Sequence, residues 1–181
     1  MRTVGLSLGL ALLCLLCAEA EDLGAVGLDK SKIEGKWHII ALASDSEGYL
    51  RKKDELKMAM ATIKVLGGGD LKASFAIPTP EGCKKLERTY KETGIPGEYY
   101  SSDGDNRTVQ VMDTDGKTYA VIFVSRVKDG KTLRMLRLYS RTRKVSPKIT
   151  ALFKKFARAK SFTDEMIVML PSQEECSLDE A

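Results

Sequence analysis

Gly35-Lys36-Trp37, followed by the apolar run His38-Ile39-Ile40-Ala41-Leu42-Ala43, is the stretch that decides the fold. The run predicts a first β-strand, and the glycine suits a tight turn into it. Two later features accompany this start: Thr114-Asp115-Gly116-Lys117-Thr118-Tyr119 stands ahead of a late apolar run, and Arg141 follows the last one. Trp37 is the only tryptophan of the chain, and an arginine guanidinium can stack on its indole ring.

Short runs rich in Val, Ile, Tyr, Phe and Met recur along the chain, with Gly, Pro, Asp and Asn between them. This pattern is typical of an antiparallel barrel or sandwich, and the length fits one domain. Eight strands are enough for an up-and-down barrel to close around one small ligand. The predicted fold is therefore an all-β, eight-stranded antiparallel barrel with strands at 36–44, 56–66, 71–77, 83–92, 97–101, 107–112, 118–127 and 132–140.

The hydrophobic period changes after the last predicted strand. Ser146 and Pro147 supply an N-cap and a first-turn residue for a helix. We expect one C-terminal α-helix whose apolar stripe packs on the outside of the barrel. The stripe recurs at helical spacing and consists of Ile149, Leu152, Phe153, Phe156 and Ala157.

The first twenty residues predict a secretory signal peptide. Met1-Arg2 leads into an apolar core at 4–16 and then into Ala18-Glu19-Ala20, a small-x-small cleavage site. We expect cleavage after residue 20, which leaves a single domain at 21–181 in the extracellular space. No later stretch reaches about twenty uncharged apolar residues, so stable membrane insertion is not expected.

Two cysteines remain after removal of the signal peptide. Cys14 and Cys17 leave with it, and Cys83 and Cys176 stay in the domain. A single pair in an oxidising compartment is expected to form a disulfide. Closing a loop of that length contributes about 4 to 5 kcal/mol on the chain-entropy account.

The charge pattern limits the partners. The net charge is +4, but Lys and Arg are scattered along the chain without a basic stripe interleaved with aromatic residues. The sequence therefore favours neither nucleic acid nor heparin as a partner. We expect a monomer that binds a small molecule.

Four arginines fall on strand faces that carry apolar neighbours. Successive residues of a strand face opposite sides, so Arg88 shares a face with Leu86 and Tyr90, and three further arginines alternate with apolar residues in the same way. Two such cations about 7 Å apart repel by roughly 2 kcal/mol at an effective dielectric constant near 20. Two interpretations stay open: the arginines are solvated at the open mouth, or they form an anion site inside the barrel. The other three are Arg107, Arg126 and Arg137.

The three signature stretches resemble those of the lipocalins, which have Gly-x-Trp at the first strand, Thr-Asp-x-x-x-Tyr before a late strand, and an arginine after the last. The resemblance implies that Trp37 and Arg141 stack at the closed end of the barrel. Longer matches, such as Arg126-Val127-Lys128-Asp129-Gly130 and Arg137-Leu138-Tyr139-Ser140-Arg141, point to the siderocalin branch. The structural signature residues are then Gly35, Trp37, Thr114, Asp115, Tyr119 and Arg141.

The resemblance also implies a ligand set. Siderocalins hold the catecholate rings of ferric siderophores between three cations of the calyx, and these positions fall on Arg107, Arg126 and Arg137. Arg88 matches a calyx arginine of another siderocalin. In that siderocalin a Trp stands two residues before the arginine, and Leu86 takes its place here. Long-chain fatty acids or lysophospholipids are also implied, and the alternative is transport of endogenous lipids without siderophore binding. The apolar lining we expect is Met58, Met60, Val109, Val111, Ile122, Val124 and Met135.

An enzymatic role is not expected, nor is a cofactor or a metal. One lipocalin branch uses a catalytic cysteine inside the barrel, and no thiol remains here once Cys83 and Cys176 pair. His38, the only histidine, has no second ligand at metal-binding spacing. Asn106-Arg107-Thr108 is a glycosylation sequon, and strand parity points Asn106 outward if Arg107 points inward. The loop at 45–54 is expected to cover the mouth of the barrel.

Overall fold

The computed structural model describes residues 29–104, 106–174 and 176–178. The predicted signal peptide and its two cysteines lie outside this part of the chain, and the predicted domain boundaries stay predictions. The strands are β1 (Gly35–Ser44), β2 (Ala59–Val65), β3 (Leu71–Thr79), β4 (Gly82–Glu92), β5 (Glu98–Ser101), β6 (Asn106–Thr114), β7 (Tyr119–Lys128), β8 (Lys131–Ser140) and β9 (Ile167–Met169). The helices are α2 (Lys30–Ile33), α3 (Glu47–Lys52) and α4 (Pro147–Ala159), with 3-10 turns η1 (Lys53–Glu55), η2 (Gly67–Gly69) and η3 (Asp164–Met166).

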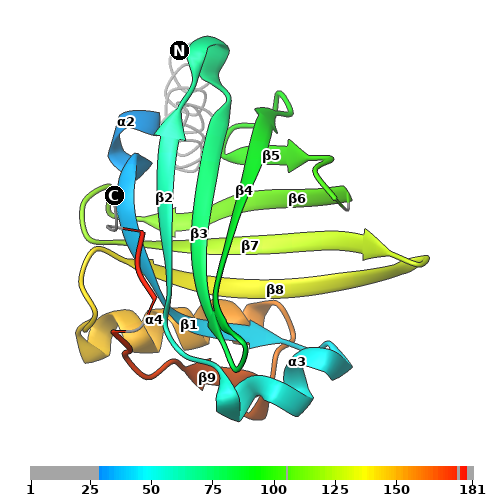
Figure 1. Cartoon of the computed structure of the whole chain (residues 1–181), viewed down its shortest axis with the longest axis vertical. Coiled ribbons are helices and arrows are strands. Elements are labelled where there is room, and N and C mark those ends of the chain that lie inside the picture. Colours follow the sequence, from blue (N-terminus) through cyan, green and yellow to red (C-terminus); the bar gives the residue numbers. More distant parts are fainter. Residues whose placement is uncertain (1–28, 105, 175, 179–181) are drawn as a thin grey trace, which may run out of the picture.

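The strands form a closed antiparallel barrel. Neighbours pair in the order β2 to β8, followed by β1 and β9, and β1 also pairs with β2. Figure 1 shows β2 to β4 crossing β6 to β8 at a steep angle, as opposite walls of the barrel. The first half of β1 pairs with β2 and its second half with β9. The eight-stranded barrel predicted from the sequence is confirmed.

The short elements differ from the prediction. The sequence did not indicate β9, which has three residues and is too short for an alternating pattern to be recognised. The predicted second strand starts at residue 59 instead of 56, because η1 and the turn after it occupy the preceding residues. The loop after β1 contains the helix α3, whose N-cap Ser46 accepts a hydrogen bond from the backbone N–H of Tyr49 at 3.3 Å.

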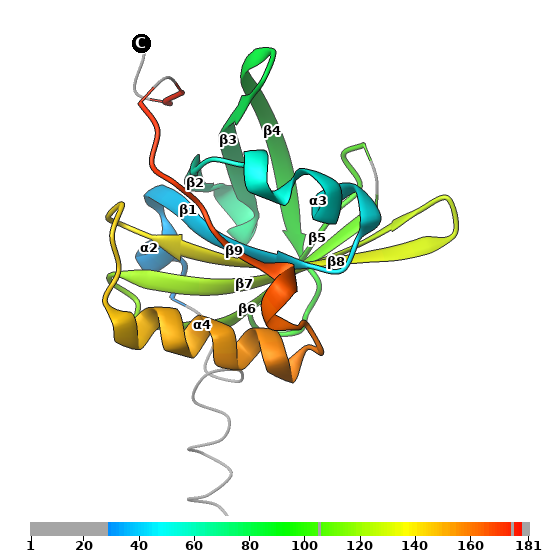
Figure 2. The ribbon, with the colours of Figure 1, turned by 90° about the horizontal axis from the view of Figure 1, so that it is seen from below.

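Helix α4 begins where the sequence predicted. The Ser146 hydroxyl accepts a hydrogen bond from the backbone N–H of Ile149 at 3.4 Å, and Pro147 is the first helical residue. Phe153 and Ala157 are completely buried in the core cluster. Figure 2 shows α4 lying along the outside of the barrel.

Arg141 and Trp37 close one end of the barrel. The guanidinium carbon of Arg141 lies 3.7 Å from the centre of the Trp37 ring. Its Nη1 donates to the carbonyl oxygen of Lys36 at 2.7 Å, and Nη2 donates to those of Glu34 at 2.8 Å and Lys32 at 3.0 Å. One arginine thus joins the end of β8 to the chain between α2 and β1.

Gly35 is required at this closed end for two reasons. Its φ of +103° is a conformation that other residues rarely adopt. A Cβ at this position would also lie 3.2 Å from Nη1 of Arg141. The glycine therefore lets the backbone approach the guanidinium group.

Asp115 and Thr114 shape the turn between β6 and β7. Oδ1 of Asp115 accepts hydrogen bonds from the backbone N–H groups of Lys117, Thr118 and Tyr119, and the Thr118 hydroxyl donates to its Oδ2. Thr114 donates through its hydroxyl to the carbonyl oxygen of Tyr119 at 2.7 Å. The Thr-Asp-x-x-x-Tyr stretch is therefore a hydrogen-bonded turn rather than a ligand site.

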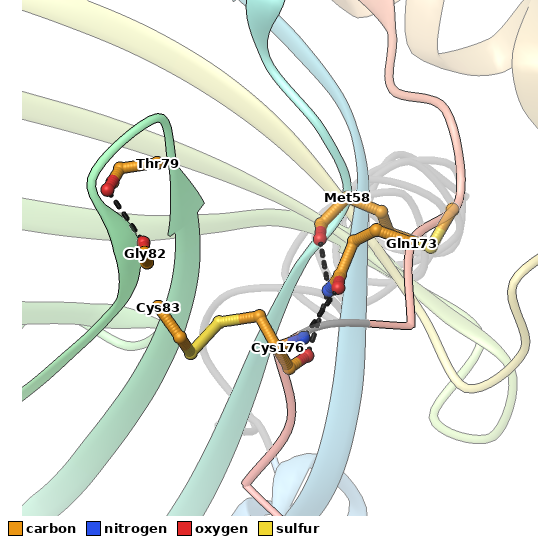
Figure 3. The surroundings of a disulfide bond; sticks show 6 residues. All are labelled: Met58, Thr79, Gly82, Cys83, Gln173 and Cys176. Carbon is orange, nitrogen blue, oxygen red and sulfur yellow. Dashed lines mark hydrogen bonds between the residues drawn. A yellow bond between two sulfur atoms is a disulfide. The ribbon is translucent and has the colours of Figure 1, made fainter.

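A disulfide ties the C-terminal segment to the β3–β4 hairpin. Cys83 and Cys176 are joined with their Cα atoms 5.3 Å apart. Figure 3 shows Gln173 beside this bond: its Nε2 donates to the carbonyl oxygen of Met58 at 3.0 Å, and its Oε1 accepts from the N–H of Cys176 at 2.7 Å. The disulfide expected from the sequence is present, and the buried glutamine holds the segment against the start of β2.

We predict that Arg141→Ala lowers the free energy of unfolding by about 2 to 4 kcal/mol, because it removes a cation–π contact and three charge-assisted hydrogen bonds. Urea unfolding measures the change. Arg143→Ala is the matched control, because Arg143 is exposed and exposed positions usually change stability by less than about 0.5 kcal/mol. Equal losses in the two variants would contradict the structural role of Arg141.

We predict that Asp115 makes the fold sensitive to acid. Burial acts to raise the pKa of Asp115, but the hydrogen bonds from Thr118, Lys117 and Tyr119 outweigh it and lower the pKa from 3.8 to about 2. A carboxyl group whose pKa is lowered by folding stabilises the fold at any pH above its unfolded-state pKa. This stability is lost as the pH falls to the folded-state pKa. Urea midpoints of the wild type should therefore fall more steeply between about pH 4 and 2 than those of Asp115→Asn, and parallel curves would refute this.

Candidate functional site

Three adjoining, partly open cavities lie in the barrel and at its mouth. A deep cavity of about 50 Å³ lies above the closed end, where Ile33 and Trp37 contribute to its lining. An upper cavity of about 390 Å³ extends to Gly48, Tyr49 and Lys52 of α3. A rim cavity of about 170 Å³ lies beside the β7–β8 hairpin. Together they form a calyx that is apolar at its floor and cationic towards its mouth.

Strand register brings the four predicted arginines into this calyx. Arg107 and Arg137 line both the upper and the rim cavity, Arg88 lines the upper cavity and Arg126 the rim cavity. Arg107 on β6 lies directly opposite Arg126 on β7. Arg107 is only 7% exposed, and the other three are half-buried. The structure places all four side chains along the cavities, and an anion site formed by them stays a prediction.

Aromatic side chains surround the arginines. The guanidinium carbon of Arg137 lies 5.8 Å from the centre of the Phe75 ring. Burial raises the pKa of Tyr90, while the positive charges of Arg137, Arg107 and Arg88 act in the opposite direction. Three guanidinium groups therefore act on one buried hydroxyl, which stays protonated at neutral pH and can donate a hydrogen bond to an anion.

The close approach of these cations has an energetic consequence. Directly opposed residues of an antiparallel pair have Cβ atoms about 5 Å apart, as Arg107 and Arg126 do by register. Two positive charges about 7 Å apart repel by roughly 2 kcal/mol at an effective dielectric constant of 20. An anion placed between two such cations would lower this repulsion.

The segment expected to cover the mouth does contribute to the site. Tyr49 of α3 donates its hydroxyl hydrogen to the carbonyl oxygen of Met166 at 2.8 Å, and the same hydroxyl lies 3.1 Å from the carbonyl oxygen of Leu42. Lys53 donates to the carbonyl oxygen of Glu165. Burial raises the pKa of Tyr49. Sequence reasoning missed Tyr49, although an aromatic residue in a polar loop was a usable signal.

The apolar lining agrees with the prediction except at two methionines. Val109, Val111, Ile122 and Val124 line the deep cavity and Met135 the upper and rim cavities. Met60 instead packs with Ala76 and Cys176 on the outer side of the barrel, because its neighbours Ala59 and Ile63 take the inward positions of β2. Met58 belongs to the buried core and is not among the residues that line the three cavities.

Other predicted features lie outside the calyx. Asn106 is exposed, and its Oδ1 accepts a hydrogen bond from the Tyr100 hydroxyl at 2.7 Å. This bond uses the amide oxygen and not the nitrogen that a glycan would modify, and glycosylation there stays a prediction. Within residues 29–104, 106–174 and 176–178, no group of three or more His, Cys, Asp or Glu could hold a metal ion. In the same ranges no helix is long and apolar enough to cross a bilayer.

Comparisons with known proteins agree with this calyx. The profile of the lipocalin / cytosolic fatty-acid binding protein family matches residues 34–174. The extracellular fatty acid-binding protein of Coturnix japonica is 56% identical over 180 residues, which are 99% of each chain. The solved structure of the siderocalin Ex-FABP, described as functioning through dual ligand specificities, has a TM-score of 0.79 and 52% identity, and covers 82% of this chain and 99% of its own.

One enzyme is also similar. Prostaglandin-H2 D-isomerase of Sus scrofa is 33% identical over 176 residues, 93% of each chain. In the part of this chain that the structure describes, both cysteines are used in the disulfide, so no thiol there faces the calyx. With its closed barrel, its Trp37–Arg141 closure and these relatives, the chain belongs to the lipocalin family, as an extracellular protein that binds small hydrophobic ligands.

Proposed function

We propose that this lipocalin sequesters ferric catecholate siderophores in the arginine-lined part of its calyx. The observation that supports the proposal most is the convergence of Arg107, Arg126 and Arg137 from three adjacent strands on one rim cavity. A ferric tris-catecholate complex carries about three negative charges on flat aromatic rings, and arginine offers both charge and a planar stacking surface. The ligand would remove the repulsion between the guanidinium groups, and its own chelation would hold the iron.

Arg88 and Leu86 would adjust which catecholate is accepted. Both line the upper cavity, and Nη1 of Arg88 donates to the carbonyl oxygen of Asp103 at 2.5 Å. This bond fixes the guanidinium beside the β5–β6 loop. Leu86 supplies an apolar wall without a ring for stacking, so selectivity would rest on the cations more than on aromatic contacts.

A second class of ligand, fatty acids or lysophospholipids, fits the deeper part of the same calyx. Arg137 lines all three cavities, so one carboxylate or phosphate head could pair with it beside Tyr90. The alkyl chain would then extend from the upper cavity into the apolar deep cavity, where burial contributes about 0.8 kcal/mol per methylene. This apolar floor also favours the alternative function, transport of endogenous lipids without siderophore binding.

The residues that line the calyx suggest a binding protein and not an enzyme. We propose that the protein works as a monomer. Acyl or isomerase chemistry of the prostaglandin type would need a nucleophile in the calyx. The residues that line the three cavities include no cysteine. Size-exclusion chromatography with light scattering measures the oligomeric state directly.

We predict that ferric enterobactin quenches the intrinsic fluorescence of Trp37 and the tyrosines, and that Arg126→Ala weakens binding about 10- to 100-fold through loss of a charge-assisted contact. Titration of fluorescence measures the dissociation constant. Arg143→Ala removes an exposed arginine outside the calyx and should bind as the wild type does. Absence of quenching in the wild type, or an unchanged constant in Arg126→Ala, would sink the siderophore proposal.

We predict that Ala73→Val separates the two ligand classes. Ala73 lines the deep cavity, and the two added carbons would displace roughly two methylenes of an alkyl chain, about a tenfold loss in fatty-acid affinity. Siderophore quenching should stay unchanged because no charge is altered. Competition with a fluorescent fatty acid measures the first effect, and thermal melting checks for strain from the larger side chain. An equal loss of affinity for both ligands would argue against binding of the two ligand classes at different depths of the calyx.

A further inference from the structure

The positive charge of this protein is concentrated in one segment. Residues 131–163 contain eleven Lys and Arg residues and no Asp or Glu. Because the whole chain has a net charge of +4, the other 148 residues carry a net charge of −7. This segment spans β8, the loop after it and α4.

Four of the eleven cations are arginines with structural or calyx positions. Arg137 faces the calyx and Arg141 stacks on Trp37. Arg134 forms an ion pair with Asp45 at 2.8 Å, and Arg158 pairs with Asp164 at 3.2 Å. The remaining seven are Lys131, Arg143, Lys144, Lys148, Lys154, Lys155 and Lys160.

Four of the seven are exposed and lie on α4 or directly before it, and we call them the α4 basic face: Arg143, Lys144, Lys148 and Lys155. Lys148 and Lys155 are seven residues apart, so they lie on the same side of α4 about 10.5 Å from each other. Arg143 and Lys144 come just before the N-cap Ser146. The buried side of α4, with Phe153, points the other way.

Lys148 runs against what the helix itself favours. The N-terminal end of a helix carries partial positive charge, so acidic residues stabilise it and cations do not. The first turn of α4 contains no acidic residue and does contain Lys148. Helix stability therefore does not account for Lys148, whereas a binding surface for a polyanion would.

The apolar residues of α4 argue against a membrane as the partner. A membrane-surface helix inserts its apolar face between lipids, but that face of α4 packs on the barrel core. The exposed large apolar side chains of the described residues are Leu66, Ile95, Tyr100, Val127 and Met169, none of them on α4. Anionic lipids also face the cytoplasm, and this protein is extracellular. An anionic polymer that meets only exposed cations fits the α4 basic face better.

We propose that the α4 basic face binds a sulfated polysaccharide. Basic clusters of this kind are recognised as heparin-type patches. Figure 2 shows barrel strands between α4 and α3, the helix at the mouth. The bound polymer would hold the protein in the pericellular matrix while the mouth of the calyx stays accessible.

The test uses size-defined heparin on a biosensor at 0.15 M NaCl with three full-length forms. The triple variant Lys144→Gln, Lys148→Gln, Lys155→Gln should lose affinity on the order of tenfold or more, and the salt dependence of its binding should become shallower, as for other polyanions. The control triple Lys64→Gln, Lys84→Gln, Lys91→Gln removes the same charge from exposed positions on β2 and β4. It should change affinity less than about twofold.

Three outcomes would overturn the proposal. The first is that the wild type does not bind heparin at this salt concentration. The second is that both triple variants lose the same affinity for heparin, which would mean that binding depends on net charge alone. The third is that the wild type binds vesicles with phosphatidylserine, or duplex DNA, at least as tightly as heparin, and that the first triple variant loses this binding too. Thermal melting and ferric enterobactin quenching should stay unchanged in the first triple, so a failure of this proposal is distinguishable from a failure of the siderophore proposal.

Discussion

Closure of the barrel by β1 is the constraint on which the rest of the structure depends. β1 pairs with β8 along one edge. Along its other edge, the first half of β1 pairs with β2 and the second half pairs with β9. The Arg141 guanidinium fixes this closure, because it stacks on Trp37 and bonds to three backbone carbonyl groups of the incoming chain. Once the barrel is closed, strand alternation alone decides which side chains share its interior.

The calyx arginines follow from that constraint. They lie on rigid strands and not on loops, and register sets Arg107 opposite Arg126 before any ligand arrives. Two cations about 7 Å apart repel by roughly 2 kcal/mol at an effective dielectric constant near 20. Under the siderophore proposal, a guest with several negative charges would lower such repulsion. Tyr90, which stays protonated in the same cluster, adds a neutral donor.

The sequence predicted features that depend on local pattern and failed where depth or contacts between distant segments decide. Alternation placed Arg88 and Arg107 on inward faces, and the N-cap Ser146 located α4. The sequence-based prediction placed Met60 in the lining of the cavity, which is wrong. A run of small and apolar residues in β2 covers both faces, so their polarity does not show which face points inward. Alternation could not tell mouth from interior for Arg126. Tyr49 gains its role from carbonyl groups that come close only in the fold.

The positive charges of the protein divide into two populations with different physical consequences. Those of the calyx are partly or fully buried, so salt screens them less than exposed charges. Those of the α4 basic face are exposed, so each contributes little alone and only a partner with regularly repeated charges can use them together. Because the barrel wall separates the two sets, either can act without altering the other.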